Sequence, residues 1–288
     1  MSIQRNKWLR RNHTQVIALS LLLWVAASFH WIFTSPCSGR VVSGIAECSL
    51  LERGQTEKAD GFEARIFKNA RGKTMPYRLF IPRVYDAQKK YPLMLWLHGG
   101  GGRGIDNVKQ ISEGNKSGSH IWTTPANQTT YPSFVLAPQC PEGEMWTTID
   151  TAKSTDQLKL VLELLVAIQK EFSIDANRLY VAGQSMGGLG AWSLISEHPG
   201  MFAAAIPVCG GGDETLAPRL VKTAIWAFHG AQDQSISANR SRQMIAAIRK
   251  AGGSPRYTEY PDLGHNSWDR AFAEPDLLPW LFAQSTPR

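Results

Sequence analysis

Ser185 is the residue whose neighbours most clearly point to nucleophilic chemistry. It lies between Gly183 and Gly187 in the run Gly-Gln-Ser-Met-Gly, which follows an apolar run at 179–182 and precedes a helix-like segment. This order predicts a strand, a tight turn with the serine at its apex, and a helix. Glycines beside the apex let the strand and the helix pass close together. Backbone N–H groups at the helix start, beginning with that of Met186, are free to bind developing negative charge.

A serine hydroxyl is a weak nucleophile unless a base accepts its proton, and the sequence offers candidates for a base and for an acid. His265 follows the last strand-like run, and an imidazole can accept a proton at neutral pH and return it to a leaving group. We expect Asp233 to hold the other ring nitrogen. Asp213, Asp262 and Asp269 are the alternatives, but Asp213 follows a run one strand too early and Asp262 lies three residues before the histidine.

The oxygen of a tetrahedral acyl intermediate needs at least two N–H donors. The backbone of Met186 supplies the first. We expect Gly100 to supply the second, with Gly101 as the alternative, because the glycine run at 99–102 allows the backbone to approach a ligand closely. This run lacks the Gly-Lys-Ser/Thr ending of a phosphate-binding loop.

Two further residues are predicted to contact a substrate. Trp146 comes from the loop after the fourth strand-like run, and Gln184 precedes the serine. Simple packing of the loop is the alternative for Trp146. His98 and His229 each precede a glycine at a strand end, where an imidazole braces a loop more often than it does chemistry. The sequence shows no spacing typical of a metal site, and a serine reaction of this kind needs no cofactor.

Eight apolar or alternating runs are the predicted strands. They lie at 62–67, 77–81, 93–97, 134–137, 179–182, 203–208, 224–228 and 257–260. A turn-like segment joins the first two and predicts a hairpin, whereas most later runs are unbroken, as is typical of strands covered on both faces. Helical patterns at 158–172 and 237–253 alternate with the later runs. The order predicts a mostly parallel sheet with helices on both faces.

The chain of 288 residues, 43% of them hydrophobic, can bury a sizeable core. Its net charge of +7 includes four charges within the first eleven residues, so the rest carries only +3, too little to indicate nucleic-acid binding. Those basic residues precede an apolar run at 16–33, the order of an export signal. The run is also close to the lower length limit for a bilayer span.

Residues 1–33 are compatible with two interpretations, a cleaved signal peptide and an uncleaved membrane anchor. Either outcome predicts that the remainder lies outside the cytoplasm, as a secreted, periplasmic or membrane-anchored domain. We expect a linker at 34–56 and a single catalytic domain at 57–288. Disulfides are compatible with export. Cys37 and Cys48 could close a loop in the linker, whereas Cys140 and Cys209 are expected to be buried near the site.

From about residue 57 to the C-terminus, the motifs resemble the α/β-hydrolase superfamily. The similar stretches are 97–102, 137–139, 183–188, 207–211, 229–233 and 264–265. Within the superfamily they look like the bacterial esterase group, which includes feruloyl-esterase-like and polyhydroxybutyrate-depolymerase-like enzymes. In that family the nucleophile, acid and base follow strands 5, 7 and 8, and Ser185, Asp233 and His265 follow the fifth, seventh and eighth predicted runs.

The resemblance implies an exported serine carboxylesterase that acts on small-molecule or polymer-linked esters through a Ser-His-Asp triad. The polar insertion at 103–132 does not resemble the apolar lid of an interfacial lipase, which disfavours triglyceride droplets. Two alternatives stay open. One is a serine peptidase related to prolyl oligopeptidases, although such enzymes usually carry a large additional domain. The other is a non-catalytic carbohydrate- or wall-binding protein on a hydrolase scaffold.

Overall fold

The computed structural model describes residues 58–148 and 153–286, which belong to one compact unit, Glu52–Arg288. The predicted signal or anchor at 1–33, the linker at 34–56 and the cysteine pair Cys37 and Cys48 lie outside the described residues. Within the described ranges, no helix is both long and apolar enough to cross a bilayer.

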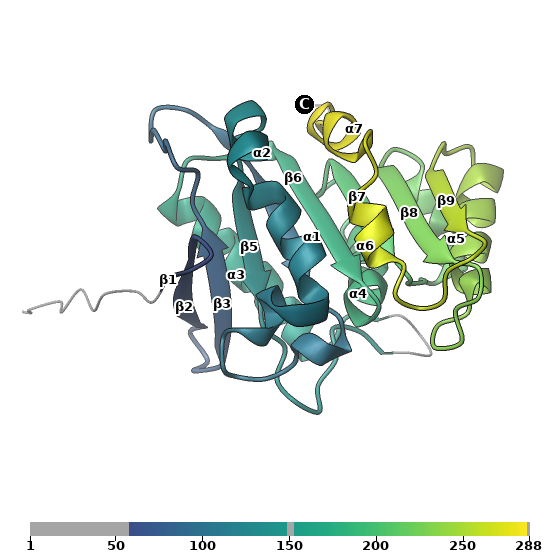
Figure 1. Ribbon diagram of the computed structural model, residues 1–288, viewed down its shortest axis with the longest axis horizontal. Helices are drawn as coiled ribbons and strands as arrows, with labels where there is room; N and C mark the ends of the chain where they lie inside the picture. Colours follow the sequence, from purple (N-terminus) through teal and green to yellow (C-terminus); the bar gives the residue numbers. More distant parts are fainter. Residues whose placement is uncertain (1–57, 149–152, 287–288) are drawn as a thin grey trace, which may run out of the picture. The chain divides into compact units, whose positions relative to one another are not determined.

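A nine-stranded sheet organises the described part of the chain (Figure 1). The strands are β1 (Lys58–Ala59), β2 (Phe62–Lys68), β3 (Thr74–Phe80), β4 (Tyr91–Leu97), β5 (Phe134–Pro138), β6 (Ile174–Gln184), β7 (Ala204–Val208), β8 (Ala224–Gly230) and β9 (Arg256–Tyr260). Their spatial order is β1-β2-β3-β5-β4-β6-β7-β8-β9. The pairings from β1 to β5 are antiparallel, and those from β5 through β4 to β9 are parallel. The predicted mixed sheet with an antiparallel hairpin is confirmed.

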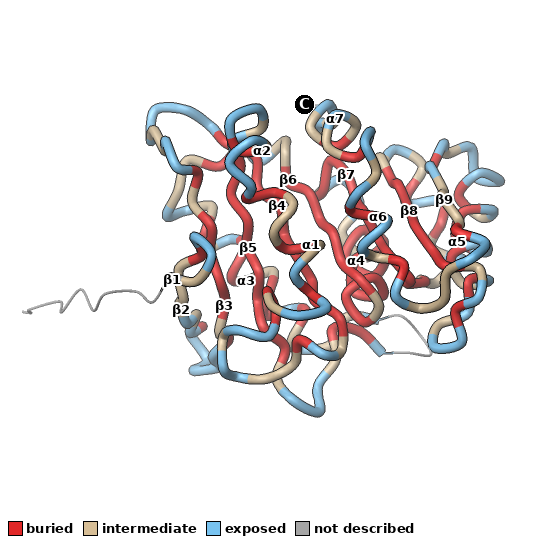
Figure 2. Tube along the Cα trace, in the orientation of Figure 1, coloured by how far each residue is buried: buried red, intermediate tan, exposed pale blue. Residues whose placement is uncertain are grey.

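Two apolar cores lie on opposite faces of the sheet, because successive side chains of a strand point to opposite sides. In β4, Leu93, Leu95 and Leu97 belong to one core, while Met94 and Trp96 belong to the other. This arrangement explains why β4 is an unbroken apolar run and is buried along its whole length (Figure 2).

Long helices cover the first face, as the periodicity predicts. They are α3 (Asp156–Glu171), α4 (Met186–Glu197) and α5 (Ala238–Lys250). Leu158, Val161 and Leu165 place one stripe of α3 in the core. Ser237 is the N-cap of α5, and its hydroxyl accepts a 3.3 Å hydrogen bond from the N–H of Asn239.

Short helices cover the second face. Those of the polar insertion are η1 (Gly100–Gly102), η2 (Lys109–Ile111), η3 (Glu113–Asn115), α1 (Lys116–His120), η4 (Ile121–Thr123) and α2 (Pro125–Thr130). They are followed much later by α6 (Trp268–Phe272) and α7 (Leu277–Phe282). The short helix η5 (Glu214–Leu220) lies on the first face instead, because its buried residues Ala217 and Leu220 belong to the first core. Gly118 lets α1 pack closely, since a Cβ there would overlap the rings of Trp96 and Phe272. The insertion is therefore a folded cover over this part of the sheet.

Candidate active site

Three loops bring Ser185, Asp233 and His265 together at one edge of the sheet. The loops follow β6, β8 and β9, which are parallel and so end at the same edge. Oγ of Ser185 lies 2.8 Å from Nε2 of His265, and Nδ1 of His265 lies 2.7 Å from Oδ2 of Asp233. The structure thus joins in one hydrogen-bonded row the three side chains that the sequence selected.

Ser185 occupies a strained turn between β6 and α4. Its φ of 54° lies in the region that residues other than glycine rarely adopt, and its ψ is −118°. A Cβ on Gly183 would overlap the carbonyl of Gly187, and one on Gly187 would overlap the carbonyl of Leu97. The two glycines are therefore required for strand and helix to pass this closely, and the predicted strand-turn-helix geometry is confirmed.

The hydrogen-bond partners decide the tautomer of His265. A carboxylate can only accept hydrogen bonds, so Nδ1 of His265 carries the hydrogen that is donated to Asp233. Nε2 is then free to accept the hydroxyl hydrogen of Ser185. This orientation suits removal of a proton from the serine and its later return to a leaving group.

Asp233 is held as a carboxylate. Its side chain is fully buried, and burial alone would raise its pKa. The hydrogen bond from His265 and the backbone N–H groups of Ile236 and Ser235 outweigh burial, so the pKa of Asp233 lies below its ordinary value. The two N–H donors lie 2.9 and 2.8 Å from Oδ1. The group that faces His265 is therefore charged at neutral pH.

The competing aspartates lie elsewhere. Asp213 caps η5, where Oδ1 accepts from the N–H of Thr215 at 3.0 Å. Asp262 is exposed and pairs with Arg270 at 3.1 Å. Asp269 accepts from the hydroxyl of Ser117. Of these four aspartates, Asp233 is the one in contact with His265.

A cavity of about 350 Å³ opens beside Ser185 and His265. Its lining is formed by Gly99, Gly100, Gly101, Glu113, Gly114, Asn115, Gln184, Ser185, His265 and Trp268. Gly100 therefore reaches the cavity from η1. Met186 is the first residue of α4, so its N–H has no acceptor four residues back within that helix, while its side chain is buried in the core. Their oxyanion roles stay predictions.

Gln184 lines the cavity, but Trp146 does not. Nε2 of Gln184 donates to the carbonyl of Gly114 at 2.7 Å, and Oε1 is buried without a partner among the described residues. Trp146 is fully buried, and its indole N–H donates to the carbonyl of His98 at 3.1 Å. Its Cβ fills the space that Gly190 of α4 leaves open. The predicted substrate contact by Trp146 is corrected to loop packing.

Two parts of the cavity wall were not predicted from the sequence. Glu113, Gly114 and Asn115 reach it from the polar insertion. Oδ1 of Asn115 accepts from the N–H of Gly99 at 2.9 Å, which ties the insertion to the glycine run. Trp268 lies perpendicular to the His265 ring, with 5.6 Å between the centroids. One signal for this residue was present in the sequence, because Trp268 follows His265 by only three positions.

One cluster among the described residues could in principle supply three metal ligands: Cys209, His229 and Asp233, whose ligand atoms lie within 4.8 Å of one another. Burial raises the pKa of Cys209 to about 11, so its thiol stays protonated and donates to the carbonyl of His265 at 2.9 Å. His229 and Asp233 are already hydrogen-bonded to each other at 3.1 Å. The chemistry of this cluster therefore suits hydrogen bonding.

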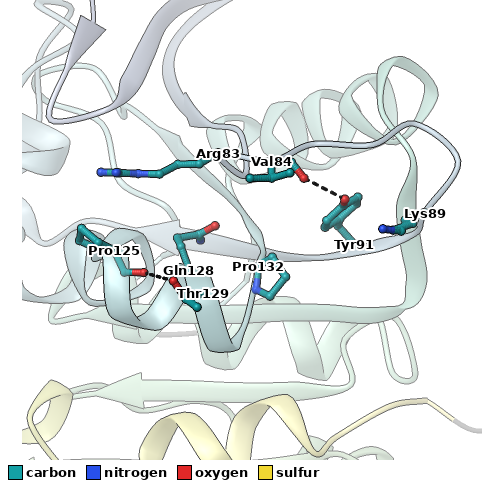
Figure 3. A pocket seen from close by; sticks show the side chains of 8 residues that line it. All are labelled: Arg83, Val84, Lys89, Tyr91, Pro125, Gln128, Thr129 and Pro132. Atoms are coloured by element: carbon teal, nitrogen blue, oxygen red, sulfur yellow. Dashed lines mark hydrogen bonds between the residues drawn. The ribbon is translucent and has the colours of Figure 1, made fainter.

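A larger cavity of about 450 Å³ lies at the beginning of β4, away from the strand ends that carry Ser185 (Figure 3). Two hydroxyl groups on its wall are already paired. The hydroxyl of Tyr91 donates to the carbonyl of Val84 at 3.2 Å, and that of Thr129 donates to the carbonyl of Pro125 at 2.8 Å. The smaller cavity, which is lined by a serine that is hydrogen-bonded to a histidine, is therefore the candidate active site.

Comparisons with known proteins agree with this fold. The sequence model of the dienelactone hydrolase family matches residues 136–276. A crystal structure of a thermostable esterase is 38% identical, with a TM-score of 0.75, over 78% of this chain and 64% of that chain. The probable feruloyl esterase C of Aspergillus niger is 24% identical over 67% of this chain and 68% of its own length.

An uncharacterized secreted protein of Arthroderma benhamiae is 25% identical over 67% of this chain, but the chain spans only 23% of that relative. With the sheet and the strand-turn-helix geometry at Ser185, these matches show that the chain has the α/β-hydrolase fold, and the predicted resemblance to the esterase group is confirmed. Esterases are among the proteins that this chain is similar to.

Proposed function

We propose that the chain is an exported serine carboxylesterase. The observation that carries the proposal is the row from Ser185 through His265 to Asp233, with contacts of 2.8 and 2.7 Å at the edge of a cavity. Esterase relatives support the ester bond as the target.

In the proposed first half-reaction, Oγ of Ser185 attacks the ester carbonyl while Nε2 of His265 takes the hydroxyl proton. The tetrahedral intermediate collapses, the carbon–oxygen bond to the alcohol breaks, and His265 returns the proton to the departing alkoxide oxygen. Water then attacks the acyl-enzyme with His265 again as the base, which releases the acid and restores Ser185. Asp233 holds the imidazole and stabilises its charged form.

We propose that the backbone N–H groups of Met186 and Gly100 stabilise the negative charge that develops on the carbonyl oxygen. Loss of one such donor typically costs about 3 kcal/mol of transition-state stabilisation. Neither donor requires a cofactor or a metal.

The cavity wall favours neutral substrates. Its lining includes Glu113 but no lysine or arginine. A negatively charged acyl group would be repelled by Glu113, whereas a neutral acyl group suits a wall of glycines, amides and one tryptophan. Small esters and esters attached to a polymer are the proposed substrates.

The basic and apolar N-terminal segment is the basis for proposing export.

A substrate panel tests the proposal. The full-length chain should hydrolyse p-nitrophenyl acetate and butyrate, and feruloyl and hydroxybutyrate esters would then rank the acyl groups. Aminoacyl and prolyl anilides should be inert. Cleavage of anilides with inert esters would favour the peptidase alternative. Failure of a fluorophosphonate to label Ser185 would favour a non-catalytic binding protein.

A further inference from the structure

His229 is a fully buried histidine that has no role in the proposed reaction steps, yet it contacts the acid of the site. It lies near the end of β8, and its Nε2 is 3.1 Å from Oδ2 of Asp233 and 2.9 Å from the carbonyl oxygen of Ile236. Nδ1 lies 2.8 Å from Oγ of Ser241 in α5. Contacts at both nitrogens hold the ring in one orientation.

These partners determine where the hydrogen of His229 lies. Both neighbours of Nε2 are acceptors, so Nε2 must carry a hydrogen. Burial lowers the pKa of His229, which keeps the ring neutral at neutral pH. Nδ1 then accepts from the hydroxyl of Ser241 at 2.8 Å, and that hydroxyl shares its hydrogen with the carbonyl oxygen of Gly210 at 3.0 Å. The neutral ring therefore shares its Nε2 hydrogen between the carbonyl oxygen of Ile236 and Oδ2 of Asp233.

One oxygen of Asp233 consequently receives two imidazole N–H groups. Nδ1 of His265 donates to Oδ2 at 2.7 Å, and Nε2 of His229, whose hydrogen is shared with the carbonyl of Ile236, lies 3.1 Å from the same atom. The other oxygen, Oδ1, receives the two backbone N–H groups of the loop. Because His229 shares the oxygen that holds His265, it fixes the position of that oxygen and reduces the negative charge available to His265.

We propose that His229 is a positioning residue, whose Nε2–H holds Oδ2 of Asp233 and limits how strongly that oxygen stabilises the protonated form of His265. The inference rests on the proposed function, in which His265 is the base. The proposal predicts the direction in which the pH profile of activity shifts. Without this donor, Asp233 stabilises the imidazolium of His265 more strongly, so activity should require a higher pH.

Other titratable groups near His229 keep one charge across the working range. The thiol of Cys209, in the loop after β7, has its pKa raised by burial and stays neutral. Glu259 in β9 hydrogen-bonds to Arg242 at 2.7 Å, which lowers the pKa of Glu259 and keeps it charged. A change in the pH profile after substitution of His229 would therefore be transmitted through Asp233 and His265.

Two substitutions separate the two nitrogens of the ring. In His229→Gln, the longer side chain can place its amide N–H₂ where Nε2 lies and keep a donor toward Asp233. In His229→Asn, the shorter side chain can reach Ser241 but not Asp233. The activity of the full-length chain toward p-nitrophenyl acetate is measured from pH 5.5 to 9, together with thermal unfolding, for the wild type and both variants.

We expect His229→Asn to lower kcat by about 10- to 100-fold, the loss that a misplaced catalytic group produces. The pH of half-maximal kcat/KM on the acid side should rise by roughly half to one unit, as expected for one lost hydrogen bond to a charged group. His229→Gln should restore most of kcat and the wild-type profile. A loss of stability in both variants with unchanged pH profiles would overturn the inference, as would a shift of equal size in both.

Wild-type measurements separate this inference from the proposed function. If fluorophosphonate labels Ser185 and esters are hydrolysed, the proposed function stands whatever the variants show. The nitrogen-15 chemical shifts of His229 then report its tautomer without any substitution, even if a variant fails to fold. A hydrogen on Nε2 supports the inference. A ring with its hydrogen on Nδ1 alone would overturn it, because no donor would face Asp233.

Discussion

Nε2 of His98 lies 3.0 Å from the backbone nitrogen of Cys140 and accepts its hydrogen. This bond joins the loop after β4 to the loop after β5, beside the glycine run of the cavity. Nδ1 faces the carbonyl oxygen of Gly99 at 2.6 Å and carries the single ring hydrogen. Burial lowers the pKa of His98 to about 4, so the ring stays neutral. The loop-bracing geometry predicted for this histidine is present.

Acidification should destabilise the fold through His98. The unfolded chain takes up this proton near pH 6.5, whereas the folded chain resists it until about pH 4. Within that window the unfolded state binds more protons, so the free energy of unfolding rises with pH and is lost as pH falls. The full loss amounts to roughly 3 kcal/mol. Urea unfolding at several pH values between 4.5 and 7.5 measures it.

The matched variant is His98→Gln, whose amide can donate and accept but cannot titrate. His120 and His229 also have pKa values lowered by burial, so they add to the slope of both proteins. The difference between the two slopes isolates His98, and the slope of the variant should be shallower by up to one proton. Equal slopes would show that His98 is not buried as a neutral ring.

Ser185→Ala should remove turnover and leave the fold intact. The substitution deletes one hydroxyl on a turn, and alanine can adopt the same backbone angles at a similar cost. We expect kcat for p-nitrophenyl acetate to fall by roughly 10⁴- to 10⁶-fold. The free energy of unfolding should change by less than about 0.5 kcal/mol. A large drop in the thermal midpoint would mean that the serine is structural.

Gly187→Ala should destabilise the protein because its new Cβ has no room. The atom would overlap the backbone carbonyl of Leu97 and lie 2.9 Å from that of His98. Backbone atoms of β4 cannot move aside easily, so we expect a loss of about 1–3 kcal/mol in urea unfolding. Gly101→Ala is the control, since a Cβ there meets no atom within 4 Å. Similar stability of the two variants would contradict the close approach at Gly187.

The sheet could be predicted because its strands are covered on both faces and therefore stand out as apolar runs. The two-residue β1 was missed, since a pair of residues such as Lys58 and Ala59 carries no periodicity. The polar insertion was also missed as structure. Its helices have three to six residues, too few to show a helical stripe, and it is held by contacts between distant segments, such as the hydrogen bond from the indole N–H of Trp96 to the carbonyl of Gln110.

Chain order was enough to select Ser185, Asp233 and His265, because parallel strands end at the same edge and the loops after them meet there. The rest of the cavity depends on contacts between distant segments. Asn115 reaches Gly99 across 16 positions of irregular chain, and no local pattern marks it. The predicted substrate contact of Trp146 was wrong although its loop leaves from the correct edge of the sheet. The side chain turns inward to the space beside Gly190.

Asn115 should affect both the stability of the protein and its kcat, because it anchors the glycine run. It is almost fully buried. Oδ1 accepts from the N–H of Gly99 at 2.9 Å, and Nδ2 donates to the carbonyl of Lys109 at 3.1 Å. In Asn115→Ala, the buried N–H of Gly99 loses its partner, which costs about 1–3 kcal/mol. The neighbouring donor proposed at Gly100 also loses its anchor.

That donor would act mainly in the transition state, so Asn115→Ala should lower kcat for p-nitrophenyl acetate by about tenfold or more and leave KM nearly unchanged. Thr130→Ala is the control, because Thr130 is exposed on α2 of the same insertion and does not line the cavity. Steady-state kinetics and urea unfolding of both variants separate the two effects. A less stable Asn115→Ala protein with normal kcat would show that the glycine run keeps its catalytic geometry without this side chain.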